Sequence, residues 1–181
     1  QKEETLTGGD FVKVTLSAGN PGTRTVLVEG APYWKTDDAI GVSDGNTNHK
    51  FDNDAQEQTA HTTFTGETSL AGELYAYYPY SLSTQISSGT LNLDIMPEQH
   101  PSLTSFDSSS DIMVAKPFVL ESASKTASLE FARLGAIVKI VLSDLSSELS
   151  ADIVKSVSLT ADKSLAGSIP VDLAAQTTGE V

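Results

Sequence analysis

The chain has 181 residues, of which 39% are hydrophobic and 19% are charged, so it can bury a core and lacks the charge density of a disordered protein. Its 24 acidic and 11 basic side chains give a formal net charge of −13, which disfavours nucleic acid and anionic membranes, because both attract basic patches. The absence of Cys excludes thiol catalysis, thiolate metal sites and disulfides.

In the first half of the chain, short runs of alternating apolar and polar residues predict β-strands. In chain order we expect a polar leader at 1–9, strands at 11–16 and 24–29, a stop at 30–32, a long exposed loop at 43–60, and strands at 61–65, 73–78 and 90–95. In the first of these strands, Val12, Val14 and Leu16 share one face. That face is therefore expected to point into the core.

The second half of the chain continues the same pattern. In chain order we expect a loop at 97–110 and strands at 111–115, 118–121, 128–131, 135–142, 154–159 and 165–171. Residues 135–142 are apolar on both faces, which predicts a central strand. Only 144–150 favours a helix, of one or two turns with Asp144 as N-cap. The sequence leaves open whether a second lobe starts near residue 126.

These elements predict an all-β fold, a Greek-key β-sandwich or barrel of about 7 to 10 short strands. Enzyme motifs are missing from the sequence. The three histidines, His49, His61 and His100, show no metal-ligand spacing such as H-E-x-x-H, and no G-x-S-x-G motif occurs. We therefore expect no enzyme activity and no cofactor.

One loop partly matches a calcium-binding pattern. Asp44, Asn46 and Asn48 reproduce the first three alternating oxygen ligands of a calcium loop. His49 then replaces the Gly of the sharp turn, and Ala55 replaces the bidentate Glu. We predict no metal site.

Six short motifs, in this order and spacing, together resemble the fimbrillin-like family of type V pilins and related fimbrial lipoproteins from Gram-negative anaerobes. They are residues 34–42 (WKTDDAIGV), 64–66 (FTG), 75–81 (YAYYPYS), 99–101 (QHP), 111–115 (DIMVA) and 131–136 (FARLGA). Each motif alone is weak, and the set extends across residues 10–172.

The resemblance implies a transthyretin-like Greek-key β-sandwich over residues 10–181, the N-terminal domain of the family. A second sandwich usually follows, so we expect a C-terminal domain that this chain does not include. Family members are exported as lipoproteins. The resemblance thus places the protein on the extracellular face of the outer membrane, or in a fimbrium, with a lipidated Cys upstream of Gln1.

The resemblance also implies an assembly chemistry. A protease specific for basic residues cuts after an early strand, and a donor strand from another pilin subunit fills the opened groove by β-augmentation. Here Arg24 would be the scissile residue and Thr25 the new N-terminus. The donor would replace the face formed by Val12, Val14 and Leu16. The other arginine, Arg133, lies in strand-like sequence.

We therefore expect a structural or adhesive fimbrial subunit, whether stalk, tip or anchor. Its partners would be other pilin subunits, the processing protease and surface ligands of the host or of bacteria. The alternative is a surface glycan-binding lipoprotein that stacks sugars on Trp34, Tyr75 or Tyr77, although tyrosines are common in strands for packing alone. A hydrolase on a β-scaffold would need a cleft of acids with perturbed pKa values.

Overall fold

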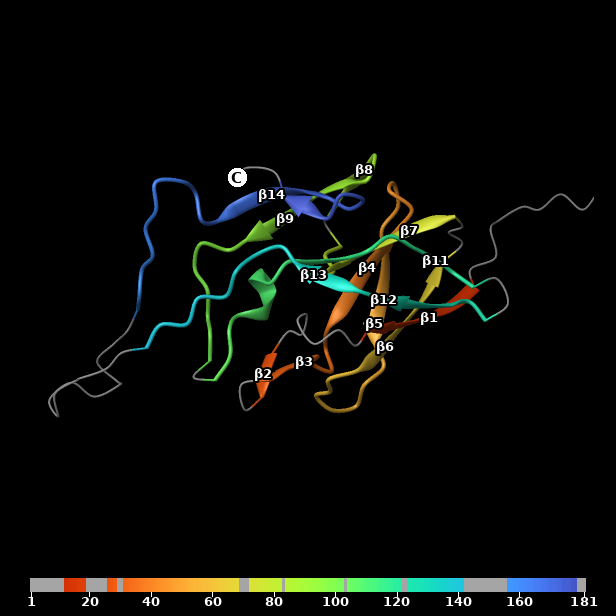
Figure 1. Cartoon of the computed structure of the whole chain (residues 1–181), viewed down its shortest axis with the longest axis horizontal. Helices are drawn as coiled ribbons and strands as arrows, with labels where there is room; N and C mark the ends of the chain where they lie inside the picture. Colours follow the sequence, from red (N-terminus) through yellow and green to blue (C-terminus); the bar gives the residue numbers. More distant parts are fainter. Residues whose placement is uncertain are drawn as a thin grey trace, which may run out of the picture.

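The structure is a computed structural model that describes residues 12–18, 26–28, 31–68, 72–82, 84–102, 104–121, 124–141 and 156–178, and it is all-β and sandwich-like (Figure 1). The strands are β1 (Val12–Ala18), β2 (Val26–Val28), β3 (Ala31–Tyr33), β4 (Ala39–Ser43), β5 (His49–Asn53), β6 (Thr62–Thr68), β7 (Glu73–Tyr78), β8 (Ile86–Ser87), β9 (Thr90–Ile95), β10 (Met113–Ala115), β11 (Phe118–Val119), β12 (Thr126–Leu129), β13 (Phe131–Arg133), β14 (Gly167–Asp172) and β15 (Thr177–Thr178). A 3₁₀ turn, η1, spans Ser108–Ser110. The all-β prediction is confirmed. The Greek-key detail and the domain limits stay predictions.

None of the described residues belongs to a helix with the length and hydropathy needed to span a bilayer.

The strands form two main sheets and a separate hairpin. The large sheet has the order β12-β1-β6-β5-β4-β7-β10-β13, with β11 paired to β7. The small sheet has the order β15-β14-β9-β8, and β2 and β3 form the hairpin. In Figure 1 the small sheet lies above β4 and β7 of the large sheet. The predicted strands 73–78 and 90–95 coincide with β7 and β9.

The large sheet is strongly curled. Its two outermost strands, β12 and β13, are separated along the chain by Glu130 alone, although they lie at opposite ends of the pairing order. The backbone N–H of Lys116 also donates to the carbonyl of Glu130 (2.9 Å). A single short segment can border both edges only if the sheet bends round, so the large sheet encloses much of its own core.

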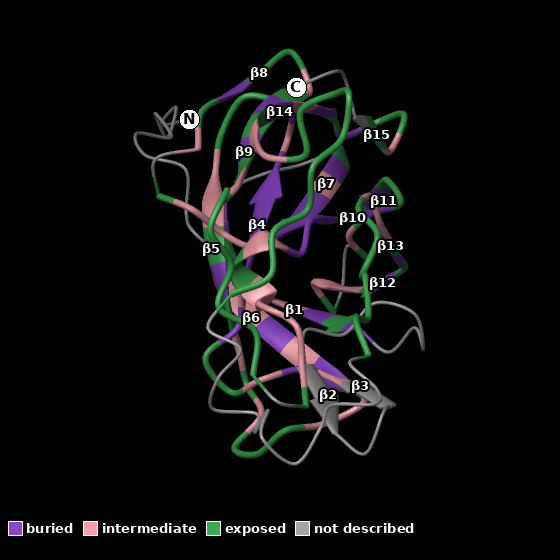
Figure 2. Ribbon diagram, turned by 90° about the vertical axis from the view of Figure 1, so that its left-hand side faces the viewer, coloured by how far each residue is buried: buried purple, intermediate pink, exposed green. Residues whose placement is uncertain are grey.

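Two apolar clusters result from this arrangement, and Figure 2 shows the buried residues along β4 and β7. The first core lies on the enclosed face of the large sheet and consists of Val14, Leu16, Ala18, Trp34, Ile40, Val42, Phe51, Phe64, Leu74, Ala76, Tyr78, Met113, Ala115, Phe118, Leu129 and Phe131. The second core joins the large sheet to the small one and consists of Tyr77, Ile86, Leu91, Leu93, Ile112, Val114, Ile169, Val171 and Leu173. Successive residues of β7 and β10 alternate between the two cores, so both strands are buried on both faces.

The prediction of a long exposed loop at 43–60 was wrong. Residues His49–Asn53 form β5, which pairs with β4 on one side and β6 on the other. Its single large apolar side chain, Phe51, is fully buried and lies opposite Gly66. Polar residues surround Phe51 in the sequence, so the apolar alternation that marks a strand is too weak to detect there. The strand expected at 61–65 also continues past Gly66 in β6. That glycine lies opposite Phe51 and makes room for its ring.

The prediction of a central strand at 135–142 was also wrong. Residues 136–141 have no strand assignment, and the apolar side chains among them are exposed, with Val141 at 70%. A doubly apolar segment becomes a central strand only when neighbouring strands cover both faces, and the described residues provide no such partners here. The predicted strand at 154–159 likewise has no strand assignment over 156–159, and its first two residues lie outside the described residues.

Two smaller predictions complete the comparison. The expected break between strands at residues 30–32 was wrong for residues 31 and 32, because Ala31–Tyr33 forms β3 and pairs with β2. The expected helix at 144–150 lies outside the described residues. Near residue 126 the chain continues into β12 and β13, and both pair within the large sheet.

Candidate functional site

The N-terminal strand β1 lies inside the large sheet with a neighbour on each side. It pairs antiparallel with β6 along its whole length, from Val12 opposite Thr68 to Ala18 opposite Thr62. Its C-terminal half pairs with β12 in parallel, from Thr15 opposite Thr126 to Ala18 opposite Leu129. This is the one parallel pair among the described strands, and it joins segments more than 100 residues apart.

One face of β1 is part of the first core. Val14, Leu16 and Ala18 are 1%, 0% and 3% exposed. The same core includes Phe64 on β6 and Leu129 on β12, the two strands that flank β1. The space between β6 and β12 that β1 fills is called the β1 slot from here on.

The opposite face of β1 is polar. The Ser17 hydroxyl is exposed and lies 3.2 Å from the Ser128 hydroxyl of β12. The backbone N–H of Thr15 donates to the carbonyl of Lys125 (3.2 Å). Along residues 14–18, β1 therefore alternates small or branched apolar side chains on its inner face with short hydroxyl side chains on its outer face.

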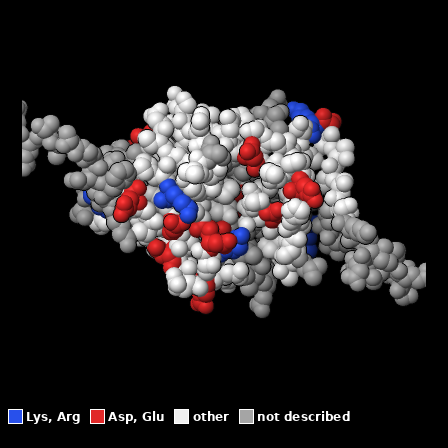
Figure 3. All heavy atoms as spheres, turned by 180° about the vertical axis from the view of Figure 1, so that it is seen from behind, with Lys and Arg blue, Asp and Glu red and all other residues white. Residues whose placement is uncertain are grey.

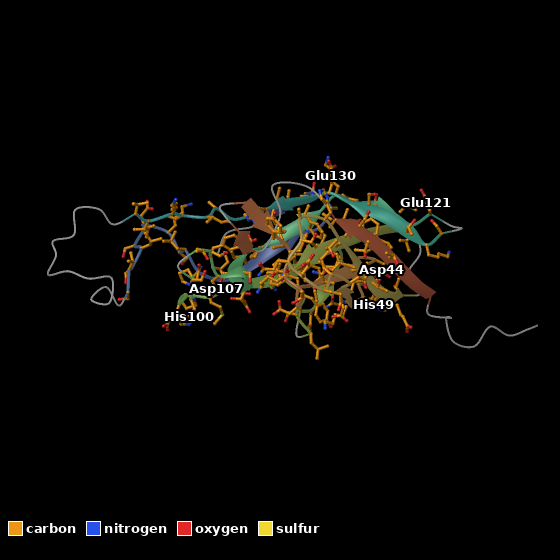
Figure 4. All side chains as sticks on the ribbon, turned by 90° about the horizontal axis from the view of Figure 1, so that it is seen from below. Asp44, His49, His100, Asp107, Glu121 and Glu130 are labelled. Carbon is orange, nitrogen blue, oxygen red and sulfur yellow. The ribbon has the colours of Figure 1, made fainter. Side chains whose placement is uncertain are left out.

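A shallow groove of about 360 Å³ opens where β1 ends. It is lined by Ser17, Ala18, His61, Thr62, Ser128, Leu129 and Glu130. These residues come from the ends of β1 and β12 and from the start of β6, so the groove extends the slot to the surface. Glu130, which directly follows β12, is labelled in Figure 4.

Two of the three residues predicted to form the apolar face of the first strand, Val14 and Leu16, point into the core. The backbone of Val12 pairs with β6, whereas its side chain lies outside the described residues. Arg24 and Thr25 also lie outside the described residues. The alternation analysis missed Ala18, although the same period of two continues to that residue.

Neither Trp34 nor Tyr77 can act as a sugar-stacking platform in this fold, which corrects that prediction. Trp34 is 1% exposed and packs edge-on against Phe64, Tyr78 and Phe131, with ring centroids 5.1 to 5.8 Å apart. Tyr77 is fully buried, its hydroxyl donates to Asn48 Oδ1 (2.8 Å), and burial raises the pKa of Tyr77 to about 12.

Tyr75, the third residue of the glycan alternative, is half-buried. Its hydroxyl donates to the Glu73 carboxylate (3.0 Å), and this hydrogen bond raises the pKa of Tyr75. A half-buried ring held by a neighbour offers at most one stacking position. It does not form a platform of several rings.

The calcium-like loop is closed by its own hydrogen bonds. Asp44 Oδ1 accepts the backbone N–H groups of Asn46 and Thr47 (both 2.9 Å), and the Thr47 N–H bond contributes most to lowering the pKa of Asp44. The Asn48 amide is turned away, toward the carbonyl of Ser81 and the hydroxyl of Tyr77. Within the described ranges, no three His, Cys, Asp or Glu side chains are grouped so as to hold a metal ion.

The histidines are dispersed. His49 lies on β5, and Figure 4 shows it far from His100. The backbone N–H of His100 donates to Asp107 Oδ2 (2.8 Å), and this bond is the main cause of the lowered pKa of Asp107. Acidic side chains are scattered over the face in Figure 3, and the basic ones lie singly, so that face has no basic stripe for nucleic acid.

Comparison with known proteins connects this architecture to one family. A family model described as fimbrillin-like matches residues 23–179. Comparison with curated proteins finds no match. Comparison with solved structures finds none either.

Proposed function

Because the chain belongs to the fimbrillin-like family, we propose that it is a subunit of a surface fimbrium that joins its neighbours by exchange of the strand in the β1 slot. In this proposal β1 is a temporary occupant, and a strand of another pilin subunit replaces it. The family is structural, so the proposal includes no catalysis.

The observation that supports the proposal is the position of β1. This strand is enclosed by β6 and β12, and its inner side chains Val14, Leu16 and Ala18 belong to the first core. A strand of another chain can make the same backbone hydrogen bonds at this position, and loss of β1 would open the core. Loss of an edge strand on the surface would leave the core closed and would create no site for a donor strand.

The energetics make an empty slot unfavourable. Burial of a Val or Leu side chain contributes about 1.5 to 3 kcal/mol, so Val14 and Leu16 together contribute about 3 to 6 kcal/mol before the hydrogen bonds of β1 are counted. This is comparable with the whole stability of a typical domain, about 5 to 15 kcal/mol. A subunit that loses β1 would therefore gain strongly from a donor strand.

Processing would control the exchange. Arg24 follows β1 and precedes β2 in the sequence, so cleavage there would release β1 from the rest of the chain and leave Thr25 as the N-terminus. Arg133, by contrast, lies in β13 and binds the Asp111 carboxylate through Nε and Nη2 (2.5 and 2.8 Å). The proposal includes export and a lipid anchor before processing.

Limited trypsin digestion of the folded protein tests this function. We expect the first product to begin at Thr25 and to convert from monomer to higher-order species in size-exclusion chromatography. Under the same digestion, the matched variant Arg24→Gln should give no product that begins at Thr25 and should stay monomeric. If digestion starts elsewhere and no product begins at Thr25, the proposed maturation is wrong. If cleaved chains stay monomeric, strand exchange is wrong.

A further inference from the structure

A second segment of the chain carries the same side-chain pattern as β1. Residues 14–18 have the sequence Val-Thr-Leu-Ser-Ala, and residues 157–161 have the sequence Val-Ser-Leu-Thr-Ala. The three residues that β1 buries are identical in type and spacing in the second segment. The two outward residues differ only by exchange of Ser and Thr.

This second segment is exposed and has no strand partner in the structure. Val157 and Leu159 are 54% and 59% exposed, and Ala161 is exposed as well. No strand is assigned between residues 156 and 166. Exposed apolar side chains spaced at every second residue are typical of a strand that binds elsewhere.

The exposed segment and the β1 slot lie at opposite ends of the molecule. In Figure 1, β1 lies at the right and the blue segment after residue 156 lies at the left, and Figure 4 shows the same separation along the longest axis. The segment is therefore too remote to fill the slot of its own chain in this fold. A contact between opposite ends of two copies is head-to-tail, and such contacts produce rings or open filaments rather than two-fold dimers.

We propose that residues 157–161 of one copy are a donor strand for the β1 slot of a second copy, an inference that rests on the function proposed above. In the register of β1, Val157 would lie opposite Gly66 of the acceptor, and Leu159 would lie opposite Phe64. Thr160 would take the place of Ser17 and bring a hydroxyl to Ser128.

A rival segment also resembles β1. Residues 138–143 have the sequence Val-Lys-Ile-Val-Leu-Ser, close to Val-Lys-Val-Thr-Leu-Ser at residues 12–17. Its next residue, Asp144, would take the place of the buried Ala18. Ala18 is 3% exposed and lies opposite Leu129, so a carboxylate placed there would lose most of its water beside an apolar side chain, which is unfavourable. The slot should thus select 157–161 over 138–144.

Peptide exchange into the folded chain tests the assignment. The full chain carries a site-specific protease sequence in place of residues 19–24, so that β1 is cut free after folding without reliance on Arg24. Fluorescent peptides of residues 155–163, 11–19 and 136–144, and a 155–163 peptide with Leu159→Asp, are then added. Fluorescence anisotropy measures binding, and mass spectrometry measures release of the β1 fragment.

We expect the 155–163 peptide to release the β1 fragment with an affinity within about tenfold of the 11–19 peptide. The Leu159→Asp peptide should bind at least about 100-fold more weakly, because it places a charge beside Phe64. Binding of 11–19 without binding of 155–163 would overturn this inference and leave the proposed function standing, as would tighter binding of 136–144. If no peptide enters the slot, both the inference and strand exchange are overturned.

Variants of the full chain give an independent test. Leu159→Asp and the control Leu165→Asp change side chains of similar exposure, 59% and 54%. Both proteins should fold with a Tm within about 1 °C of the wild type, because surface substitutions cost little. After cleavage of β1, only Leu159→Asp should prevent formation of higher-order species in sedimentation velocity. Equal assembly of the two variants would overturn the inference.

Discussion

Gly41 of β4 lies directly opposite Tyr77 of β7, and the Tyr77 ring covers the space that a side chain at residue 41 would need. A Cβ atom there would lie 2.1 Å from Cε1, 2.3 Å from Cζ and 2.6 Å from the hydroxyl oxygen of Tyr77. Carbon atoms in contact are normally about 3.5 to 4.0 Å apart, so the Gly41→Ala protein must move the ring. An aromatic ring over a cross-strand glycine is a known way to stabilise such a position.

Two effects contribute to the loss of stability expected for Gly41→Ala. Overpacking a well-packed core costs about 1 to 3 kcal/mol. The displaced Tyr77 hydroxyl also loses its hydrogen bond to Asn48, and a buried hydroxyl without a partner costs about 1 to 3 kcal/mol. We therefore expect Gly41→Ala to lower the free energy of unfolding by about 3 kcal/mol. With a urea m-value of about 2 kcal/mol per M, the midpoint should fall by about 1.5 M.

Urea unfolding can be followed through the fluorescence of Trp34, the single tryptophan, which is buried in the first core. Gly135→Ala is the matched control, because a Cβ there meets no atom within 4 Å, and it should change the stability by less than about 0.5 kcal/mol. In a Tyr77→Leu background the overlapping ring atoms are absent, and Gly41→Ala should cost less than about 1 kcal/mol. An equal cost in both backgrounds would refute the steric explanation.

Two further predictions concern buried polar groups. Since burial raises the pKa of Tyr77 to about 12, its neutral form is favoured in the folded state, and the stability it contributes is complete below pH 10 and lost as the pH rises to 12. Tyr77→Phe should reduce this alkaline loss by about 2 to 3 kcal/mol in denaturant titrations at pH 9 and pH 12, and an unchanged pH profile would contradict the assignment. Arg133→Ala leaves the buried Asp111 carboxylate without its ion-pair partner and should cost about 3 to 5 kcal/mol in urea unfolding, whereas the double replacement Arg133→Met with Asp111→Leu should cost clearly less. A double variant as unstable as Arg133→Ala would show that the charge pairing is not the cause.

Several strands were predictable because their signal is local. In β9, apolar and polar residues alternate without interruption, and in β7 Leu74, Ala76 and Tyr78 occupy every second position before Pro79 ends the strand. The inner face of β1 was predictable for the same reason, since Val14 and Leu16 stand two residues apart. The family resemblance was also local, because it rests on short motifs in a fixed order, and the family model confirms it.

Other features depended on partners far away in the chain. β5 contains one large apolar residue, Phe51, and becomes a strand because β4 and β6 lie on either side of it. Residues 136–141 have a stronger strand pattern than β5, yet they are exposed because no described strand covers them. Burial of Trp34 and Tyr77, which excludes both as sugar-stacking rings, likewise depends on the neighbouring sheets.

The sequence by itself determined the all-β class, the absence of thiol chemistry, the alternation that gives β1 an apolar face, and the family to which the chain belongs. The tertiary structure decided that β1 lies between β6 and β12, that β12 runs parallel to it, and that residues 157–161 remain exposed at the other end of the molecule. The physical reason is that a strand's periodicity is set by its own residues. Its partners are set by contacts between segments that lie far apart in the chain, and no local pattern records them.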